Sequence, residues 1–304
     1  MIETEKLTRK FGDLVAVDNL TFRVNQGEIF GFLGPNGAGK TTTIRMLCCL
    51  ISKTSGQARI AEYEVGNKSD SLKIRKLIGF VSDNVGLYDS LTAYENLDYY
   101  GKLYKCPESS RKENIERFLR ILGLWEKKDF AAGTFSKGMK QKLAIARALI
   151  HDPEILFMDE PTANLDPEAS KTVREFILEL KKEKKTIFLN THNLDEAQRI
   201  CDRIGILNTK LMALGTPTEL EHLVGGSKIV IQLEQVNDAI LSALKKLSLG
   251  NMIRDDRKLT IEVTDPDKEN PAIVRAIVNA GGNIQYVSPA GSSLEDAYLK
   301  LVRE

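Results

Sequence analysis

The octapeptide GPNGAGKT, Gly34 to Thr41, constrains the fold more than any other stretch of the chain. It matches G-x-x-x-x-G-K-[ST], the phosphate-binding loop, and stands between an apolar, β-prone segment (24–33) and a helix-prone one (41–50). Its glycines let successive backbone N–H groups point at phosphate oxygens, and the following helix adds its positive dipole end. A chance match is expected in roughly one per cent of chains of this size. The stretch therefore predicts a nucleotide site made by Gly34, Pro35, Asn36, Gly37, Ala38, Gly39, Lys40, Thr41 and Thr42.

Two residues of this loop have expected roles toward a bound nucleotide. Lys40 is expected to reach the β- and γ-phosphates, and the Thr41 hydroxyl is expected to ligate Mg²⁺. Phosphate-loop enzymes also need an acidic group at the end of a buried strand. The segment EILFMDEP, residues 154–161, has that pattern, because an apolar run leads directly to two acids.

The two acids are Asp159 and Glu160, and a histidine ends the next apolar strand along the chain. We expect Asp159 to hold the water shell of Mg²⁺ and Glu160 to polarise an attacking water. The alternative, a helix cap or a surface pair, is disfavoured by the apolar run and by the phosphate loop upstream. A lone histidine is more often structural, but the position of His192 at a strand end predicts a γ-phosphate contact.

Strands alternate with helices on both sides of the phosphate loop, which predicts an α/β domain with a parallel sheet covered on both faces. Residues 84–149 are expected to form a helical insertion, whose helices begin at the capping boxes Thr92–Glu95 and Ser110–Glu113. Gly225-Gly226-Ser227 suggests a boundary between an ATPase-like domain, 1–224, and a small domain, 228–304. The βαββαβ order of the latter predicts a ferredoxin-like α+β fold.

Composition excludes several classes of function. The 43 Lys and Arg balance 42 Asp and Glu, and the net charge of +1 gives no electrostatic case for a nucleic-acid partner. The sequence has no apolar signal segment and no run near the roughly 18 apolar residues of a membrane span. The four cysteines lack C-x-x-C spacing and are expected to be thiols of a reducing compartment. We therefore expect a cytosolic protein that needs a partner chain for any work at a membrane.

Further motifs resemble the ATP-binding subunits of ABC transporters, over about residues 1–223. FSKGMKQKL, residues 135–143, resembles the ABC signature, and NLD, residues 164–166, resembles the D-loop. The resemblance implies that Ser136, Lys137 and Gly138 contact nucleotide, and that His192 is the switch histidine. Phe11 by itself is expected to be a plain edge contact, but it falls where the family stacks an aromatic ring on adenine.

Two motifs depart from the family pattern. Asp83 stands in place of the Q-loop glutamine; its carboxylate would still face Mg²⁺, but it adds negative charge and is one methylene shorter. In the signature, Lys137 replaces the first of two glycines and Met139 the usual glutamine. Gly138 still permits close backbone approach, and the helix beginning near Lys137 would direct its N-terminus at phosphate.

The resemblance implies ATP and Mg²⁺ as cofactors and two kinds of partner. One is a second copy, packed head to tail in the presence of ATP so that each signature closes on the other subunit's nucleotide. The other is a membrane permease on a separate chain, through which ATP hydrolysis would drive export. Five of the eight tyrosines lie within 85–104 and suggest its docking face, whereas the helical spacing of Tyr94, Leu97, Tyr100 and Tyr104 more often indicates a core stripe. The alternative function is a soluble ABC-type ATPase that acts as a regulator or on a non-membrane macromolecule.

Overall fold

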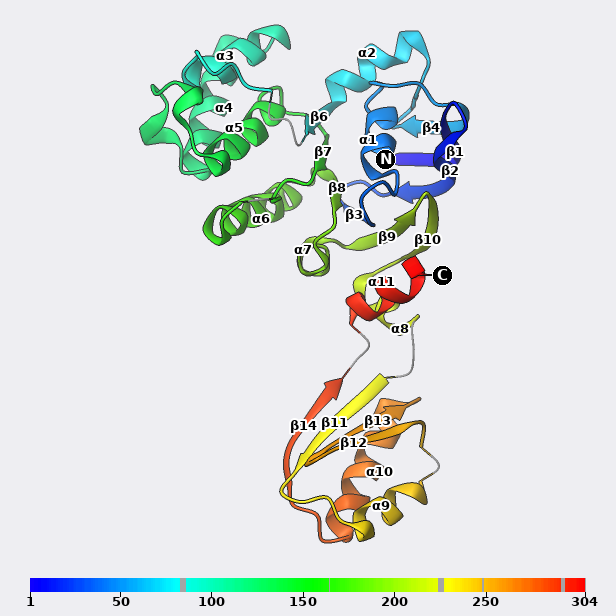
Figure 1. Ribbon diagram of the computed structural model, residues 1–304. Helices are drawn as coiled ribbons and strands as arrows, with labels where there is room; N and C mark the ends of the chain where they lie inside the picture. The colour runs from blue at the N-terminus through cyan, green and yellow to red at the C-terminus, as the bar shows by residue number, and fades with distance from the viewer. Residues whose placement is uncertain (83–85, 164, 224–226, 248, 291–292, 304) are drawn as a thin grey trace. The chain divides into compact units, whose positions relative to one another are not determined.

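The computed structural model describes residues 1–82, 86–163, 165–223, 227–247, 249–290 and 293–303 (Figure 1). It divides into two compact units, Met1–Pro217 and Thr218–Glu304. The expected boundary at Gly225-Gly226 lies outside the described residues.

The first unit is built on a six-stranded sheet with the order β10-β9-β3-β8-β7-β6. Its five strands from β9 to β6 are parallel, and β10 joins the edge antiparallel. All residues of β3, β7 and β8 are buried, as expected for a parallel sheet covered on both faces. The strands are β3 (Ile29–Leu33), β6 (Ile78–Val81), β7 (Ile155–Asp159), β8 (Thr186–Thr191), β9 (Arg203–Asn208) and β10 (Lys210–Gly215).

A second, antiparallel sheet with the order β2-β1-β4-β5 lies on the other side of α1 (Lys40–Leu47), which contacts strands of both sheets. Its strands are β1 (Ile2–Phe11), β2 (Leu14–Val24), β4 (Ser55–Ile60) and β5 (Tyr63–Glu64). An aromatic cluster joins the sheets: the Phe22 ring lies 5.5 Å from that of Phe30 and 5.9 Å from that of Phe188. Helix α2 (Lys68–Leu77) leads into β6.

The helical insertion contains α3 (Ala93–Leu103), α4 (Glu108–Ile121), η1 (Trp125–Lys127), η2 (Ala132–Thr134) and α5 (Lys137–Leu149), and the three α-helices pack together (Figure 1). The capping box of Thr92 and Glu95 is confirmed, since both of its hydrogen bonds are present. The capping box of Ser110 and Glu113 is wrong. Helix α4 begins earlier, directly after Pro107, whose fixed φ of −53° suits a helix start without a side-chain cap.

Two more helices of the first unit are α6 (Pro167–Lys182), capped by the Asp166 side chain, and α7 (Leu194–Ile200), capped by Asn193. Helix α8 (Pro217–His222) begins at the boundary between the two units. Helices α1, α6 and α7 follow the loops that leave the ends of β3, β7 and β8, respectively. Within the described residues, no helix is both long enough and apolar enough to cross a lipid bilayer.

The second unit carries an antiparallel sheet with the order β12-β13-β11-β14, which is the ferredoxin-like order predicted from the sequence. Helices α9 and α10 pack together, and side chains such as Ile240 and Ile273 share a core with Ile231 and Ile261. The elements are β11 (Ser227–Leu233), α9 (Asp238–Lys245), β12 (Met252–Asp255), β13 (Lys258–Val263), α10 (Pro266–Asn279), β14 (Ile284–Ala290) and α11 (Leu294–Arg303).

Candidate functional site

The loop between β3 and α1 encloses a cavity of about 260 Å³. Gly37 and Gly39 have φ angles of 84° and 95°, in the left-handed region that favours glycine, so the loop folds tightly ahead of the helix. The cavity is lined by the residues expected of a phosphate loop and by two acids from the end of β7: Pro35, Asn36, Gly37, Ala38, Gly39, Lys40, Thr41, Thr42, Asp159 and Glu160. Gly34 contacts the site through its carbonyl group.

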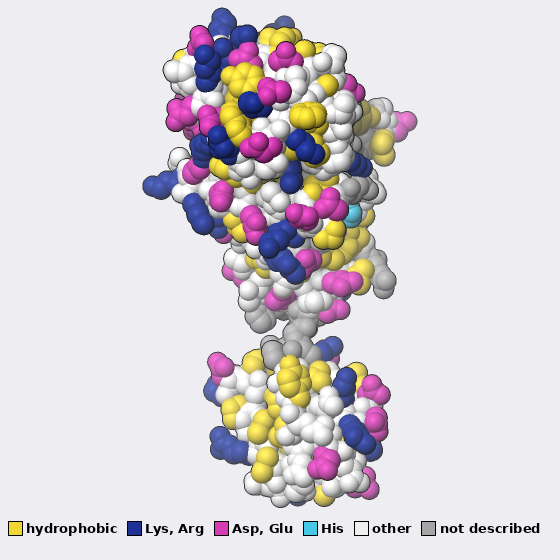
Figure 2. Space-filling model, turned by 90° about the vertical axis from the view of Figure 1, so that its left-hand side faces the viewer, with side chains coloured by type: hydrophobic (Ala, Val, Ile, Leu, Met, Phe, Trp, Pro, Cys, Tyr) yellow, Lys and Arg dark blue, Asp and Glu magenta, His cyan; other side chains and the backbone are white. Residues whose placement is uncertain are grey.

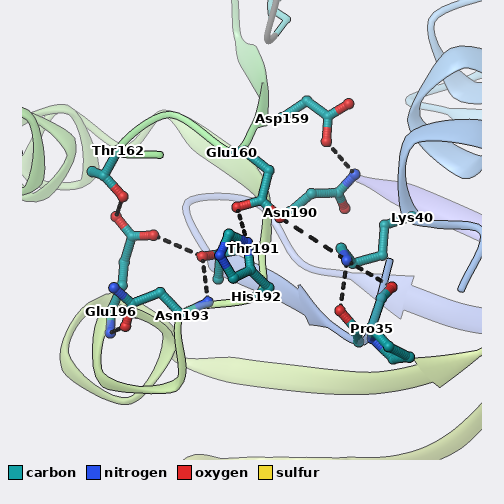
Figure 3. Close-up of polar contacts among 11 residues, drawn as sticks. Pro35, Lys40, Asp159, Glu160, Thr162, Asn190, Thr191, His192, Asn193 and Glu196 are labelled. Carbon is teal, nitrogen blue, oxygen red and sulfur yellow. Dashed lines mark hydrogen bonds and ion pairs between the residues drawn. The ribbon is translucent and has the colours of Figure 1, made fainter. Parts of the chain in front are cut away.

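Lys40 places a buried positive charge inside the loop. Its Nζ donates to the carbonyl oxygens of Gly34 at 2.6 Å and Pro35 at 3.1 Å and lies 4.0 Å from Glu160 Oε1 (Figure 3). Burial lowers the pKa of Lys40, and the nearby carboxylates of Glu160 and Asp159 oppose that shift. The ammonium group is bonded here to two neutral carbonyl oxygens. An anionic ligand would offer negatively charged oxygens, which form stronger hydrogen bonds with an ammonium group, so the loop is suited to bind one.

Asp159 and Glu160 are fixed by the end of the neighbouring strand β8. Asn190 Nδ2 donates to Asp159 Oδ1 at 3.1 Å, and the Glu160 N–H donates to the Asn190 carbonyl at 2.9 Å. Asp159 is only 2% exposed. Glu160 has a φ of 52°, so the chain turns sharply after β7, at a cost of roughly 1–2 kcal/mol for a residue with a Cβ. This turn directs the Glu160 carboxylate toward the loop and the Asp159 carboxylate toward Asn190.

His192 follows β8 directly and meets Glu160. Its Nδ1 lies 2.8 Å from Glu160 Oε2, while 60% of its side chain is exposed (Figure 3). The structure thus brings together the phosphate loop, the acid pair and the histidine that the sequence analysis selected from three separate strand ends.

The other selected residues do not line this cavity. Ser136 caps α5, accepting from the Met139 N–H at 3.3 Å, and the exposed Lys137 begins the helix. At Gly138 a Cβ would lie 3.2 Å from the Ala169 Cβ, so the signature helix packs closely on α6. Phe11 ends β1 with 46% of its surface exposed and the Arg9 guanidinium 4.3 Å from its ring centre. Asp83 and Asn164 lie outside the described residues.

Residues 17–163 match the protein family described as ABC transporter. The bacitracin transport ATP-binding protein BcrA of Bacillus licheniformis is 37% identical over 307 residues, which cover 99% of this chain and 97% of that protein. The chain belongs to the ATP-binding subunits of ABC transporters. It is therefore an ATPase subunit that energises a transporter.

This ABC subunit is also similar to a second characterised relative and to solved ATP-binding cassettes. The linearmycin resistance ATP-binding protein LnrL of Bacillus subtilis (strain 168) is 36% identical over 253 residues, covering 83% of this chain and 81% of that protein. A solved dimeric structure of the ATP-binding cassette MJ0796, bound to ADP and Pi in a post-hydrolysis state, superimposes with a TM-score of 0.65. That likeness has 26% sequence identity and covers 71% of this chain and 98% of the other.

Two buried residues of the ABC subunit's site escaped the sequence analysis. Asn190, fully buried, holds both Asp159 and Glu160, and Glu196, 1% exposed, accepts hydrogen bonds from Thr162 and Thr191. The sequence did contain a signal for Asn190: an amide side chain within an apolar strand indicates a buried hydrogen-bonding role, because a buried polar group requires a partner. Glu196 is the third residue of α7, where an acid usually indicates only a capping box.

Proposed function

We propose that this subunit hydrolyses ATP at the cavity between the phosphate loop and the β7 end, and that hydrolysis drives export through a permease on a separate chain. The observation that carries the catalytic part is the convergence of Lys40, Asp159, Glu160 and His192 on one loop. The domain assignment, 1–224 for the ATPase and 228–304 for an accessory domain, is part of the same proposal.

The residues of the chain have distinct roles in this reaction. Lys40 would exchange its two carbonyl partners for oxygens of the β- and γ-phosphates, which have more negative charge to offer. The backbone N–H groups of the loop and the N-terminus of α1 would bind the remaining phosphate oxygens. Phe11, exposed at the end of β1, is free of the main core and would stack on the adenine ring.

Glu160 is the proposed general base. A water attacks the γ-phosphorus, its proton passes to a Glu160 carboxylate oxygen, and the bond from phosphorus to the bridging oxygen of ADP breaks. His192, held 2.8 Å from Glu160, orients that carboxylate and contacts the γ-phosphate. Both side chains reach the site from strand ends, so their spacing is set by the sheet.

The oxygen groups of the site suit Mg²⁺. Thr41 and Asp159 both line the cavity, and a hydroxyl with one carboxylate is a typical protein share of a magnesium site that phosphates and water complete. Asp83 is proposed as a further oxygen ligand in place of the Q-loop glutamine, although it lies outside the described residues. The bound cation would neutralise charge that develops on the phosphate oxygens.

The signature residues support an ATP-dependent head-to-tail homodimer. Ser136, Lys137 and Gly138 form a helix N-terminus with a cap and an exposed positive side chain, yet they are absent from the lining of the subunit's own cavity. A second copy would present them to the γ-phosphate, and the MJ0796 cassette is a solved example of a dimer. Sedimentation of the Glu160→Gln protein tests this: ATP should convert monomer to dimer, and a monomer at every ATP concentration would contradict it.

The permease is proposed to dock at a groove of about 300 Å³ between the sheet and the helical insertion. Tyr100 of α3 and Tyr104, the residue directly after that helix, line it. The Arg147 guanidinium lies 5.1 Å from the Tyr100 ring, and the His151 ring is stacked 3.7 Å from that of Tyr104. Aromatic and arginine side chains are typical of interface cores. Figure 2, which faces the insertion, shows hydrophobic side chains in patches among charges of both signs.

The exposure of the tyrosines favours docking over internal packing. Tyr88, Tyr99 and Tyr104 are 46%, 39% and 42% exposed, while the buried hydrophobic side chains of the insertion are aliphatic or phenylalanine, such as Leu97 and Phe118. The docking face would bring the subunit to the cytoplasmic side of the membrane.

A charge substitution separates the possible docking faces. Tyr88 and Tyr99 border the groove, with rings 6.1 Å and 5.6 Å from that of Tyr100. Tyr88→Glu and Tyr99→Glu should therefore abolish association with permease-containing membranes while ATPase activity survives. Tyr286→Glu, at a tyrosine of the second unit that is 61% exposed, is the control and should associate normally. Retained association in the first two variants with loss in the third would move the docking site to the second unit. If none of the three variants loses membrane association and no permease co-purifies with the chain, the result would favour a soluble regulator.

Export is proposed because the relatives BcrA and LnrL carry names that refer to bacitracin transport and linearmycin resistance. A chain similar to both over most of its length fits the removal of drugs, peptides or lipids from the cell. Measuring the accumulation of labelled bacitracin in cells with and without this chain and its permease tests the direction of transport.

A further inference from the structure

Glu196 is a buried acid whose two oxygens are both taken by threonine hydroxyls. Thr162 Oγ1 donates to Oε1 at 2.7 Å, and Thr191 Oγ1 donates to Oε2 at 2.9 Å. Only 1% of Glu196 is exposed. Removing a carboxylate from water is costly, and burial raises its pKa, with the two hydroxyl bonds opposing that shift. Each of the two carboxylate oxygens of this buried acid thus accepts a hydrogen bond from a specific threonine.

The two hydroxyls belong to the segments that carry the proposed reacting groups. Thr162 is two residues beyond Glu160, and Thr191 is the residue before His192. His192 Nδ1 in turn contacts Glu160 Oε2. The three side-chain hydrogen bonds and the two short backbone segments, 160–162 and 191–192, therefore form a closed ring (Figure 3). The ring joins the turn after β7 to the end of β8 by side chains, beyond the backbone pairing of the strands.

Local hydrogen bonds free the Glu196 carboxylate for this connection. In a capping box, the acid at the third helical position would accept from the backbone N–H of the cap residue. Here the Asn193 N–H donates instead to Thr191 Oγ1 at 3.0 Å, and Asn193 Oδ1 accepts from the Glu196 N–H at 3.1 Å. The helix start is therefore satisfied without the carboxylate.

We propose that Glu196 is a positioning residue, which holds Glu160 and His192 in their mutual geometry by fixing the segments on which they stand. The proposal rests on the roles proposed above for those two residues. The connection also extends toward the signature: the Leu165 N–H donates to the Thr162 carbonyl at 3.2 Å, and a Cβ at Gly138 would lie 3.9 Å from a Leu165 methyl. The contacts therefore run from the reacting groups to the start of α5 through contiguous side chains and backbone.

Thr162 offers the sharpest test, because valine keeps its shape without the hydroxyl, and serine keeps the hydroxyl without the methyl group. Thr162→Val should lower kcat about tenfold, since small displacements of reacting groups are costly, while KM and the dissociation constant of a fluorescent ATP analogue stay within about twofold. Thr162→Ser should retain at least half of kcat. Asp195→Asn, which neutralises the exposed neighbouring acid of α7, is the matched control and should behave like the wild type.

Three outcomes would overturn the proposal. They are wild-type kcat in Thr162→Val, equal losses in the valine and serine variants, which would indicate packing alone, and a raised KM with unchanged kcat. Glu160→Gln is measured in parallel. If Glu160→Gln is inactive while Thr162→Val is normal, only the role of Glu196 fails. If Glu160→Gln turns over normally, the assignment of the base fails instead.

Discussion

Replacing Gly39 by alanine should damage the phosphate loop for two separate reasons. Gly39 has a φ of 95°, and a side chain in the left-handed region costs roughly 1–2 kcal/mol. A Cβ at this position would also lie 2.4 Å from the carbonyl oxygen of Ala16, and ordinary contact begins at 3.4 Å. The backbone of β2 or α1 would have to shift by about 1 Å, and such overpacking typically costs roughly 1–3 kcal/mol. Gly39→Ala should therefore lower the free energy of unfolding by roughly 2–5 kcal/mol.

Gly37→Ala is the matched control within the same loop. Gly37 has a φ of 84°, but a Cβ there meets no atom within 4 Å, so it should cost only the backbone strain, roughly 1–2 kcal/mol. Urea unfolding can be followed by the fluorescence of Trp125, the chain's one tryptophan, which lies in the first unit. Equal destabilisation of the two variants would refute the proposed clash with β2.

Two further predictions concern stability. Burial lowers the pKa of His151 from 6.5 to about 4, so the unfolded chain binds the proton first and stability falls as pH drops through that window, by up to roughly 3 kcal/mol. His151→Phe should remove this part of the pH dependence in urea unfolding from pH 7 to pH 4, and an unchanged slope would count against it. Thr92→Ala should cost about 1 kcal/mol by removing the cap of α3, whereas Ser110→Ala, at a position that caps no helix, should be close to neutral in the same assay.

The sequence predicted the structure best at positions where only a few residue types can satisfy the local geometry. The glycines of the loop, the apolar strands that end in Asp159 and His192, and the Thr92–Glu95 cap all predicted the structure around them. Local patterns failed where two residues compete for one role. Ser110 does not begin α4, because the helix starts earlier, directly after Pro107.

The contacts between strands could not be predicted from the sequence. Thr162 and Thr191 are 29 residues apart, and only the adjacency of β7 and β8 lets one carboxylate accept from both hydroxyls. The tyrosines in and directly after α3 were likewise not placed by the sequence. Helical spacing predicts a core stripe, but of Tyr94, Leu97, Tyr100 and Tyr104 only Leu97 is buried.

The central claim is that Glu160 is the base that activates water at the phosphate loop. Steady-state ATP hydrolysis by Glu160→Gln tests it most directly, because the amide keeps the shape of the side chain but cannot take the proton. We predict that turnover falls by a factor of roughly 10²–10⁴ while ATP remains bound. Turnover within a few-fold of the wild type, in a variant that binds ATP normally, would contradict the claim.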